Sequence, residues 1–147
     1  MILSQTAVYA VKATLHLAEA PHGDPVRVED IARSLAVPRN YLAKILGALG
    51  HAGVLQSARG RSGGFSLGRP SAEVTLAEVI APFDDIGSGS ACLLGAARCS
   101  DGAPCAAHAH WREISATVRA FLDETTVEDL THGGPPLEAP ATPSESP

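Results

Sequence analysis

The sequence predicts a mainly α fold in which a winged helix-turn-helix is followed by one long helix with an apolar face. Three observations indicate this class. Apolar residues recur at helical spacing over residues 5–20, 29–35 and 39–52. A hairpin rich in glycine and arginine follows at residues 53–67. A further helical pattern starts at Cys105, with its apolar residues near heptad spacing.

Each of the first three predicted helices has one apolar face. These faces are Val8, Val11, Leu15 and Ala18 in the first helix, Ile31, Ala32 and Leu35 in the second, and Leu42, Ile45, Leu46 and Leu49 in the third. Residues 36–38 connect the second and third helices, with Pro38 near the first turn, where proline is tolerated. Two short helices joined by a tight turn have the outline of a helix-turn-helix, although any small helical bundle contains a similar hairpin.

The hairpin after these helices has the composition of a wing. Residues 53–58 and 65–67 are the predicted strands, and residues 59–64, Arg-Gly-Arg-Ser-Gly-Gly, form the turn. Its glycines allow a close approach to a sugar–phosphate wall, and Arg59 and Arg61 can enter the narrow minor groove of DNA. The alternative is a solvated hairpin whose arginines have no role.

The charge distribution favours a nucleic-acid partner for the first half of the chain alone. The net charge of −5 by itself argues against such a partner. Up to Arg69, however, eight basic residues stand against four acidic ones, whereas the remainder has three basic and twelve acidic residues. The first half can therefore approach a phosphate backbone favourably. The predicted DNA-binding residues are Arg39, Asn40, Tyr41 and Lys44 at the start of the third helix and Arg59 and Arg61 in the wing.

The chain divides into four predicted parts. Residues 1–83 form the winged helix-turn-helix, including a short helix that Thr75 caps. Residues 84–107 form a loop, residues 105–130 a dimerisation helix and end segment, and residues 131–147 a disordered tail rich in Pro, Gly, Ser and Glu. The long helix has an apolar stripe, which a second subunit or the chain's own winged helix must cover. The stripe consists of Trp111, Ile114, Val118, Phe121 and Leu122.

Cys92, Cys99 and Cys105 are the three cysteines of the chain, and His108 follows them closely. The first residues show no basic segment leading into an apolar core, so we expect a cytoplasmic protein in which grouped thiols bind metal. No apolar run approaches the roughly 20 residues of a membrane span. The spacing Cys-x6-Cys-x5-Cys-x2-His is wider than the Cys-x2-Cys pairs of structural zinc sites, and it favours an iron–sulfur cluster.

Together these residues resemble one family, the Rrf-type iron–sulfur and redox regulators of bacteria. The resemblance spans about residues 1–130. It rests on Ile-Leu-Ser at residues 2–4 with Tyr-Ala-Val at 9–11, Asn-Tyr-Leu at 40–42, the wing sequence at 59–65 and the three cysteines. The family implies a DNA-binding transcriptional regulator that forms a homodimer by crossing of the long helices. It also implies recognition of a palindromic promoter site and a cluster whose state alters DNA binding.

The resemblance also implies that Cys92, Cys99 and Cys105 are thiolate ligands. The segment 105–111, Cys-Ala-Ala-His-Ala-His-Trp, is similar to the IscR-like branch of the family and suggests a histidine as fourth ligand. In nitric-oxide-sensing relatives an aspartate of the first helix can serve, but the corresponding residue here is Val8, which has no donor atom. If Cys105 lies in the first turn of a helix, His108 shares its face and His110 points away, which favours His108.

Other functions and cofactors remain open at this point. We expect a [2Fe-2S] cluster, with [4Fe-4S] as the alternative. The same ligands could belong to a small electron-transfer or cluster-carrier protein, which needs no basic wing. They could also hold structural zinc in a constitutive repressor. We expect no enzyme, because the sequence shows no phosphate loop and no nucleophile with a plausible base.

Overall fold

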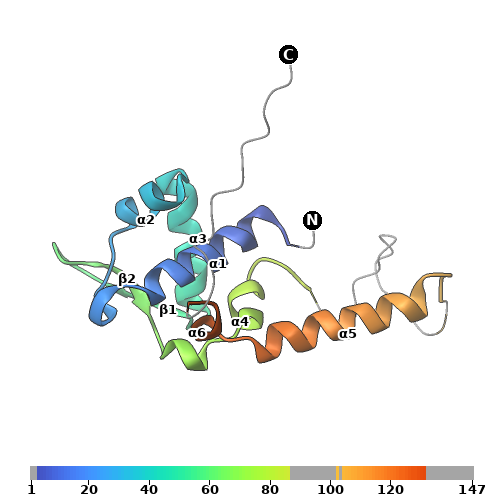
Figure 1. Ribbon diagram of the computed structural model, residues 1–147. Helices are drawn as coiled ribbons and strands as arrows, with labels where there is room; N and C mark the ends of the chain where they lie inside the picture. Colours follow the sequence, from blue (N-terminus) through green and yellow to red (C-terminus); the bar gives the residue numbers. More distant parts are fainter. Residues whose placement is uncertain (1–2, 87–101, 103, 132–147) are drawn as a thin grey trace, which may run out of the picture.

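The structure is a computed structural model that describes residues 3–86, 102 and 104–131. The elements in chain order are α1 (Gln5–Ala18), η1 (Pro21–Gly23), α2 (Val28–Leu35), α3 (Arg39–His51), β1 (Leu55–Ala58), β2 (Gly64–Leu67), η2 (Ser71–Glu73), α4 (Leu76–Ile80), α5 (His108–Glu124) and α6 (Val127–Thr131). The body gathers α1 to α4, α6 and the hairpin, and α5 extends from it (Figure 1). The predicted mainly α winged helix-turn-helix is confirmed. Residues 132–147 of the predicted tail lie outside the described residues.

Helix α1 is the central element, and its fully buried face consists of small residues. Ala7, Ala10 and Ala13 have no exposed surface. Val8 and Val11, which the apolar pattern assigned to the buried face, are only half-buried. For Val8 the prediction was wrong, whereas Val11 and Ala18 pack against the core as partly buried residues and Leu15 is buried. Helix α1 contacts α3, α4, α6 and β2, so its apolar face alone does not show which positions are most enclosed. Alanines on its most enclosed side let the neighbouring elements approach closely.

Helices α2 and α3 form the helix-turn-helix. Helix α2 ends at Ala36, whose φ of 54° lies in the left-handed region. Val37 is buried, and its N–H donates to the carbonyl oxygen of Ala32 at 3.0 Å. Pro38 then stands at the N-cap of α3. The predicted faces of both helices are confirmed by the buried residues Ile31 and Ala32 in α2 and Leu42, Ile45, Leu46 and Leu49 in α3.

The wing is joined to the segment that enters α2. Strands β1 and β2 pair in antiparallel register, with Leu55 opposite Leu67. Val26 adds a further pair of hydrogen bonds to the sheet. Its N–H donates to the carbonyl oxygen of Phe65, and its carbonyl oxygen accepts from the N–H of Phe65, both at 2.9 Å. At Gly64 a Cβ atom would lie 2.2 Å from the Val26 carbonyl oxygen. Only glycine permits this approach of two backbones.

Helix α4 follows the wing and is held to it by an ion pair. Thr75 caps α4, as predicted, in a capping box with Glu78. Arg69, two residues past β2, donates to the Glu78 carboxylate at 2.7 Å. Partial burial raises the pKa of Glu78, but the hydrogen bonds from Thr75 and Arg69 outweigh it and leave the pKa below its usual value. Glu78 is therefore ionised at neutral pH and links the wing to α4.

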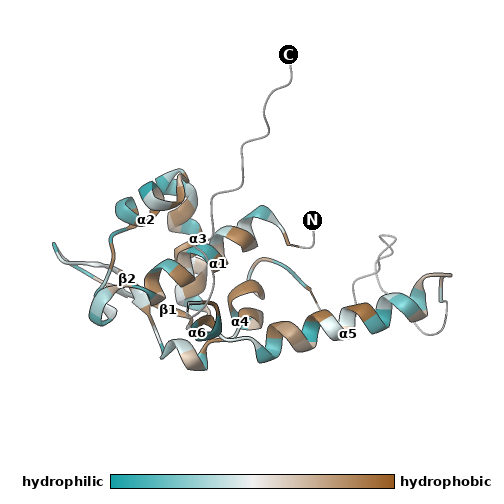
Figure 2. Cartoon of the chain, viewed as in Figure 1, coloured by the Kyte–Doolittle hydropathy of each residue, from teal (hydrophilic) through white to brown (hydrophobic). Residues whose placement is uncertain are grey.

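The C-terminal helices return to the same body. The N–H of Leu76 donates to the carbonyl oxygen of Thr125 at 2.9 Å, and the N–H of Val127 donates to that of Val74 at 2.8 Å. Leu122 near the end of α5 is buried in a cluster that includes Leu76. The other end of α5 extends away from the body, with apolar and polar residues alternating along it (Figure 2). Among the described helices, none is both long and apolar enough to cross a membrane.

Substitution of Gly64 tests the junction between the wing and Val26. The Gly64→Ala Cβ would overlap the Val26 backbone, so we expect the free energy of unfolding to fall by about 1–3 kcal/mol in urea titrations. Gly47→Ala in α3 is the matched control, since a Cβ there meets nothing within 4 Å. The control should be stabilised by up to about 1 kcal/mol because alanine favours helix. Equal stability of Gly64→Ala and the parent chain would contradict the close approach.

Candidate nucleic-acid interface and ligand segment

The start of α3 presents a polar surface opposite its buried face. Arg39, Asn40, Tyr41 and Lys44 are all exposed. Because Leu42 and the other apolar residues fix α3 against the core, Arg39, Asn40 and Lys44 lie on the outer side of the helix, with Tyr41 at its border with α1. The structure thus brings the predicted residues of α3 together on one exposed surface.

Arg39 is held by an acidic residue of the preceding helix. Its Nε donates to Oε1 of Glu29 at 2.6 Å, and the two side chains are 57% and 49% exposed. The hydrogen bond from Arg39, together with a backbone hydrogen bond at Glu29, holds the pKa of Glu29 below its usual value. Glu29 is therefore an anion at neutral pH. A bond through Nε leaves the two terminal Nη groups of Arg39 available to another acceptor.

Tyr41 is directed partly toward α1. Its hydroxyl forms a hydrogen bond with Oγ1 of Thr6 at 2.5 Å. Its ring meets that of Tyr9 edge to face, with centroids 6.1 Å apart and planes at 86°. The side chain is still 37% exposed. Tyr41 therefore fixes α3 to α1 through its hydroxyl and remains partly exposed to solvent.

The wing carries its two arginines at an exposed turn. Arg59 and Arg61 are both exposed. The turn is closed by the N–H of Gly63, which donates to the carbonyl oxygen of Gly60 at 3.0 Å. Gly60 has a φ of 99°, a conformation that favours glycine. A surface hollow of about 340 Å³ separates this turn from the start of α2, with Arg27 and Arg61 among its lining residues.

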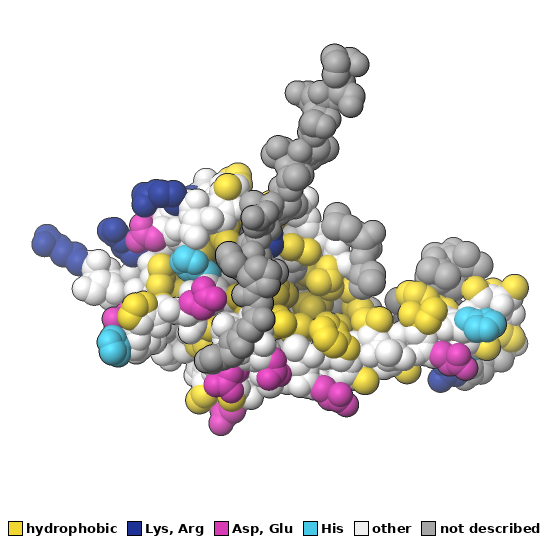
Figure 3. All heavy atoms as spheres, viewed as in Figure 1, with side chains coloured by type: hydrophobic (Ala, Val, Ile, Leu, Met, Phe, Trp, Pro, Cys, Tyr) yellow, Lys and Arg dark blue, Asp and Glu magenta, His cyan; other side chains and the backbone are white. Residues whose placement is uncertain are grey.

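Two further arginines stand near the predicted interface. Arg27 and Arg33 flank Asp30, and each forms an ion pair with it at 3.3 Å. Basic side chains gather over α2 and toward the wing tip, whereas acidic ones lie along the opposite edge of the molecule (Figure 3). Sequence reasoning missed Arg27, Arg33 and their acidic partners. The spacing of three residues on each side of Asp30 is a signal that could have indicated these pairs.

The structure describes part of the predicted ligand set. Cys105 is a free, half-buried cysteine, and the N–H of His108 donates to its carbonyl oxygen at 3.0 Å. The condition under which His108 was favoured over His110, that Cys105 lies in the first turn of the helix, is not met, because α5 begins at His108 and Cys105 lies in the preceding turn. Cys92 and Cys99 lie outside the described residues. Within the described part of the chain, no three His, Cys, Asp or Glu side chains gather as a metal site.

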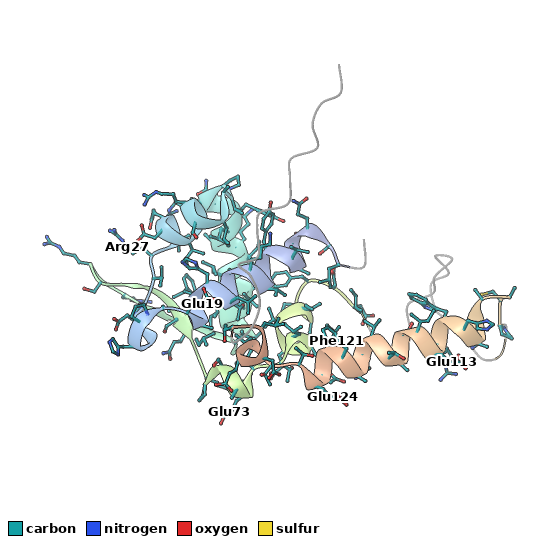
Figure 4. The ribbon with its side chains drawn as sticks, viewed as in Figure 1. Glu19, Arg27, Glu73, Glu113, Phe121 and Glu124 are labelled. Carbon is teal, nitrogen blue, oxygen red and sulfur yellow. The ribbon has the colours of Figure 1, made fainter. Side chains whose placement is uncertain are left out.

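Two apolar side chains of α5 are uncovered. Ile114 and Phe121 are each 55% exposed. Val118, on the same stripe, is half-buried, and Leu122 is buried against the body. The chain's own winged helix thus covers one edge of the predicted stripe and leaves the other open. Figure 4 shows Phe121 on the part of α5 nearest the body.

Comparison with known proteins identifies the family. Residues 3–133 match the Rrf2 family, described as an iron-dependent transcriptional regulator. The chain belongs to this family. A putative HTH-type transcriptional regulator of Aquifex aeolicus is 37% identical over 132 residues, which cover 88% of this chain and 91% of the relative. IscR of Vibrio atlanticus is 32% identical over 138 residues, covering 94% and 79%.

Solved structures agree with this Rrf2 assignment. CymR, titled the global cysteine regulator of B. subtilis, superposes with a TM-score of 0.75 at 26% identity, covering 88% of this chain and 95% of CymR. IscR of T. potens has a TM-score of 0.70 at 22% identity, covering 87% and 84%, and supports the fold. The protein is therefore a DNA-binding transcriptional regulator and not an enzyme, as the sequence predicted.

Proposed function

We propose that this Rrf2-family regulator senses iron–sulfur, iron or redox status through a cluster bound by Cys92, Cys99, Cys105 and His108. The observation that carries the proposal is the presence of three cysteines in the segment that leads to α5, and of His108 as the first residue of α5, in a chain with a winged helix-turn-helix. A homodimer would place two winged helix-turn-helix units on a palindromic promoter site in double-stranded DNA. The electron-transfer and carrier alternatives lose support, because the chain belongs to a family of regulators.

In this proposal, α3 and the wing contact different parts of the DNA. Arg39, Asn40 and Lys44 can reach base edges and phosphates from the exposed start of α3. Tyr41 adds its exposed surface while its hydroxyl remains bonded to Thr6. Arg59 and Arg61 extend from the turn of the wing, where the minor groove attracts guanidinium groups.

The wing is tested by Arg59→Ala and Arg59→Lys. We expect Arg59→Ala to weaken binding to a DNA duplex selected by the wild-type protein by about 1–3 kcal/mol and to flatten the salt dependence, since it removes one cationic contact. Arg59→Lys keeps the charge and should preserve the salt slope. Fluorescence anisotropy at several salt concentrations measures both. An unchanged affinity and slope for Arg59→Ala would contradict the wing contact.

The donor set fits an iron–sulfur cluster in its chemistry. Cysteine thiolates are the usual ligands of such clusters, and histidine replaces cysteine in some of them. Cys105 is a free cysteine within one hydrogen-bonded turn of His108. When bound, the group would supply a redox- and iron-responsive centre. The chain itself contributes the turn that joins Cys105 to the start of α5. Family membership alone does not specify this cofactor, so the cysteines and His108 carry the argument.

Metal analysis tests the ligand assignment. We expect protein purified without oxygen to carry a two-iron, two-sulfide centre per subunit by native mass spectrometry. Cys105→Ala and His108→Ala should lose it, because each removes a ligand. His110→Ala is the matched control and should retain it, since His110 is exposed two residues further along α5.

Different outcomes point to different alternatives. Zinc in place of iron would indicate the structural-site alternative, and a four-iron mass would indicate a [4Fe-4S] cluster. Loss of the cluster in His110→Ala but not in His108→Ala would move the fourth ligand to His110. Equal DNA affinity with and without the cluster would contradict the sensing role.

The open edge of the α5 stripe favours a second copy of the chain as its partner. Ile114 and Phe121 are two turns apart on one side of the helix and are more than half exposed. The predicted crossing of long helices would cover both. Burial of two large apolar side chains from each subunit would stabilise such a pair.

Phe121→Asp tests this interface. A carboxylate at the centre of an apolar contact would remain unpaired, so we expect a dimer in the wild type and a monomer in the variant by sedimentation velocity. Ala116→Asp is the matched control, because Ala116 is exposed on the opposite side of α5. A Phe121→Asp protein that sediments like the wild-type dimer would place the interface elsewhere.

A further inference from the structure

The ion pair between Glu29 and Arg39 joins the two helices of the helix-turn-helix at the surface proposed to meet DNA. Glu29 lies in the first turn of α2, and Arg39 is the first residue of α3. Their 2.6 Å contact uses Nε of the guanidinium. Arg39 is thereby held to Glu29 through Nε, while its two terminal Nη groups can point outward.

This ion pair contributes little to holding the fold together. Both side chains are about half exposed, and exposed ion pairs contribute little to stability. The helices are instead fixed to the core by Ile31 and Leu42, which are fully buried. The pair therefore calls for an explanation in terms of what Arg39 does at the surface.

An arginine beside DNA has two kinds of partner. A phosphate oxygen attracts the guanidinium group to the same extent whatever the base sequence. The O6 and N7 atoms of guanine, in contrast, accept two hydrogen bonds from the guanidinium group only where a guanine is present. A long, untethered side chain can turn toward the nearest phosphate. Tethering through Nε restricts that motion, and the carboxylate of Glu29 repels a phosphate that comes close to it.

We infer that Glu29 is a positioning residue that directs Arg39 to a base edge instead of a phosphate, and so raises sequence specificity at the expense of general DNA affinity. This inference rests on the proposed role of α3 in reading DNA. Guanine is the base whose acceptor atoms match the two outward Nη groups of Arg39. Glu29 itself makes no contact with DNA in this arrangement and acts through Arg39.

The neighbouring Asp30 offers a contrast within the same helix. It pairs with Arg27 and Arg33, both of which lie within three residues of it. Removing its charge would release two arginines toward phosphates but would leave Arg39 tethered. Asp30→Asn therefore separates a general change in local charge from the positioning of Arg39.

The experiment compares DNA selection by full-length wild-type protein, Glu29→Ala and Asp30→Asn from a random duplex pool. We expect Glu29→Ala to lose the preference for one base in each half-site. Its ratio of affinities for selected and scrambled duplexes should fall about fivefold to tenfold, a typical range for one base contact. Its binding to the scrambled duplex should strengthen, with a salt slope steeper by about 0.9 per subunit as Arg39 gains a phosphate. Asp30→Asn should bind all duplexes more tightly and keep the base preference.

A double-mutant cycle shows whether Glu29 acts through Arg39. In an Arg39→Ala background, Glu29→Ala should change neither the affinity ratio nor the selected motif. An equal change in that background would overturn the inference, as would loss of the base preference in Asp30→Asn. A Glu29→Ala protein that binds every duplex more weakly would also overturn it, since that result indicates a role in holding the helices.

The failure of this inference can be told apart from the failure of the proposed sequence recognition by α3. If wild-type protein selects no motif, α3 does not read sequence and both proposals fail. If it selects a motif that Glu29→Ala shares in full, only the positioning role fails. Thermal unfolding of each variant verifies that the folded fraction is equal in all binding measurements.

Discussion

Close packing against α1 is the constraint on which the rest of the structure depends. This helix contacts α3, α4, α6 and β2, so it determines how the reading helix, the wing and the C-terminal helices are placed relative to one another. Ala7, Ala10 and Ala13 are fully buried, and larger side chains there would push these elements apart. The hydroxyl of Tyr41 on Thr6 adds a polar contact between α1 and α3 at the outer edge of the same packing.

The sequence predicted those features that depend on local pattern. The apolar face of α3, the capping of α4 by Thr75 and the glycine-rich turn of the wing each follow from residues close together in the chain. The burial around α1 could not be predicted in the same way. A period of apolar residues identifies one face, whereas a central helix is covered on several sides, and small residues such as Ala10 then occupy the tightest contacts.

The candidate site was predictable to a smaller extent. The exposed start of α3 and the arginines of the wing follow from pattern and charge, but the ion pair of Glu29 with Arg39 joins residues on different helices and requires the tertiary fold. The start of α5 at His108 also differed from expectation. Ala106 and Ala107 extend the helical pattern backward, yet the chain forms a turn between Cys105 and His108.

A continuous series of contacts connects the ligand segment to the wing. Helix α5 begins at His108 beside Cys105, and its far end is buried through Leu122 against α4. Glu78 of α4 is bonded to Arg69, which lies two residues past β2. Contiguity alone does not transmit a signal, because coupling requires an element with two arrangements that both sites influence. The structure shows one arrangement of helix α5, in which one end is fixed by backbone hydrogen bonds beside α4 and the rest extends from the body with Ile114 uncovered. If the proposed cluster site and dimer are both present, a ligand bound beside His108 would act on the wing by changing how α5 meets the second subunit, while the packing around α1 stays constant.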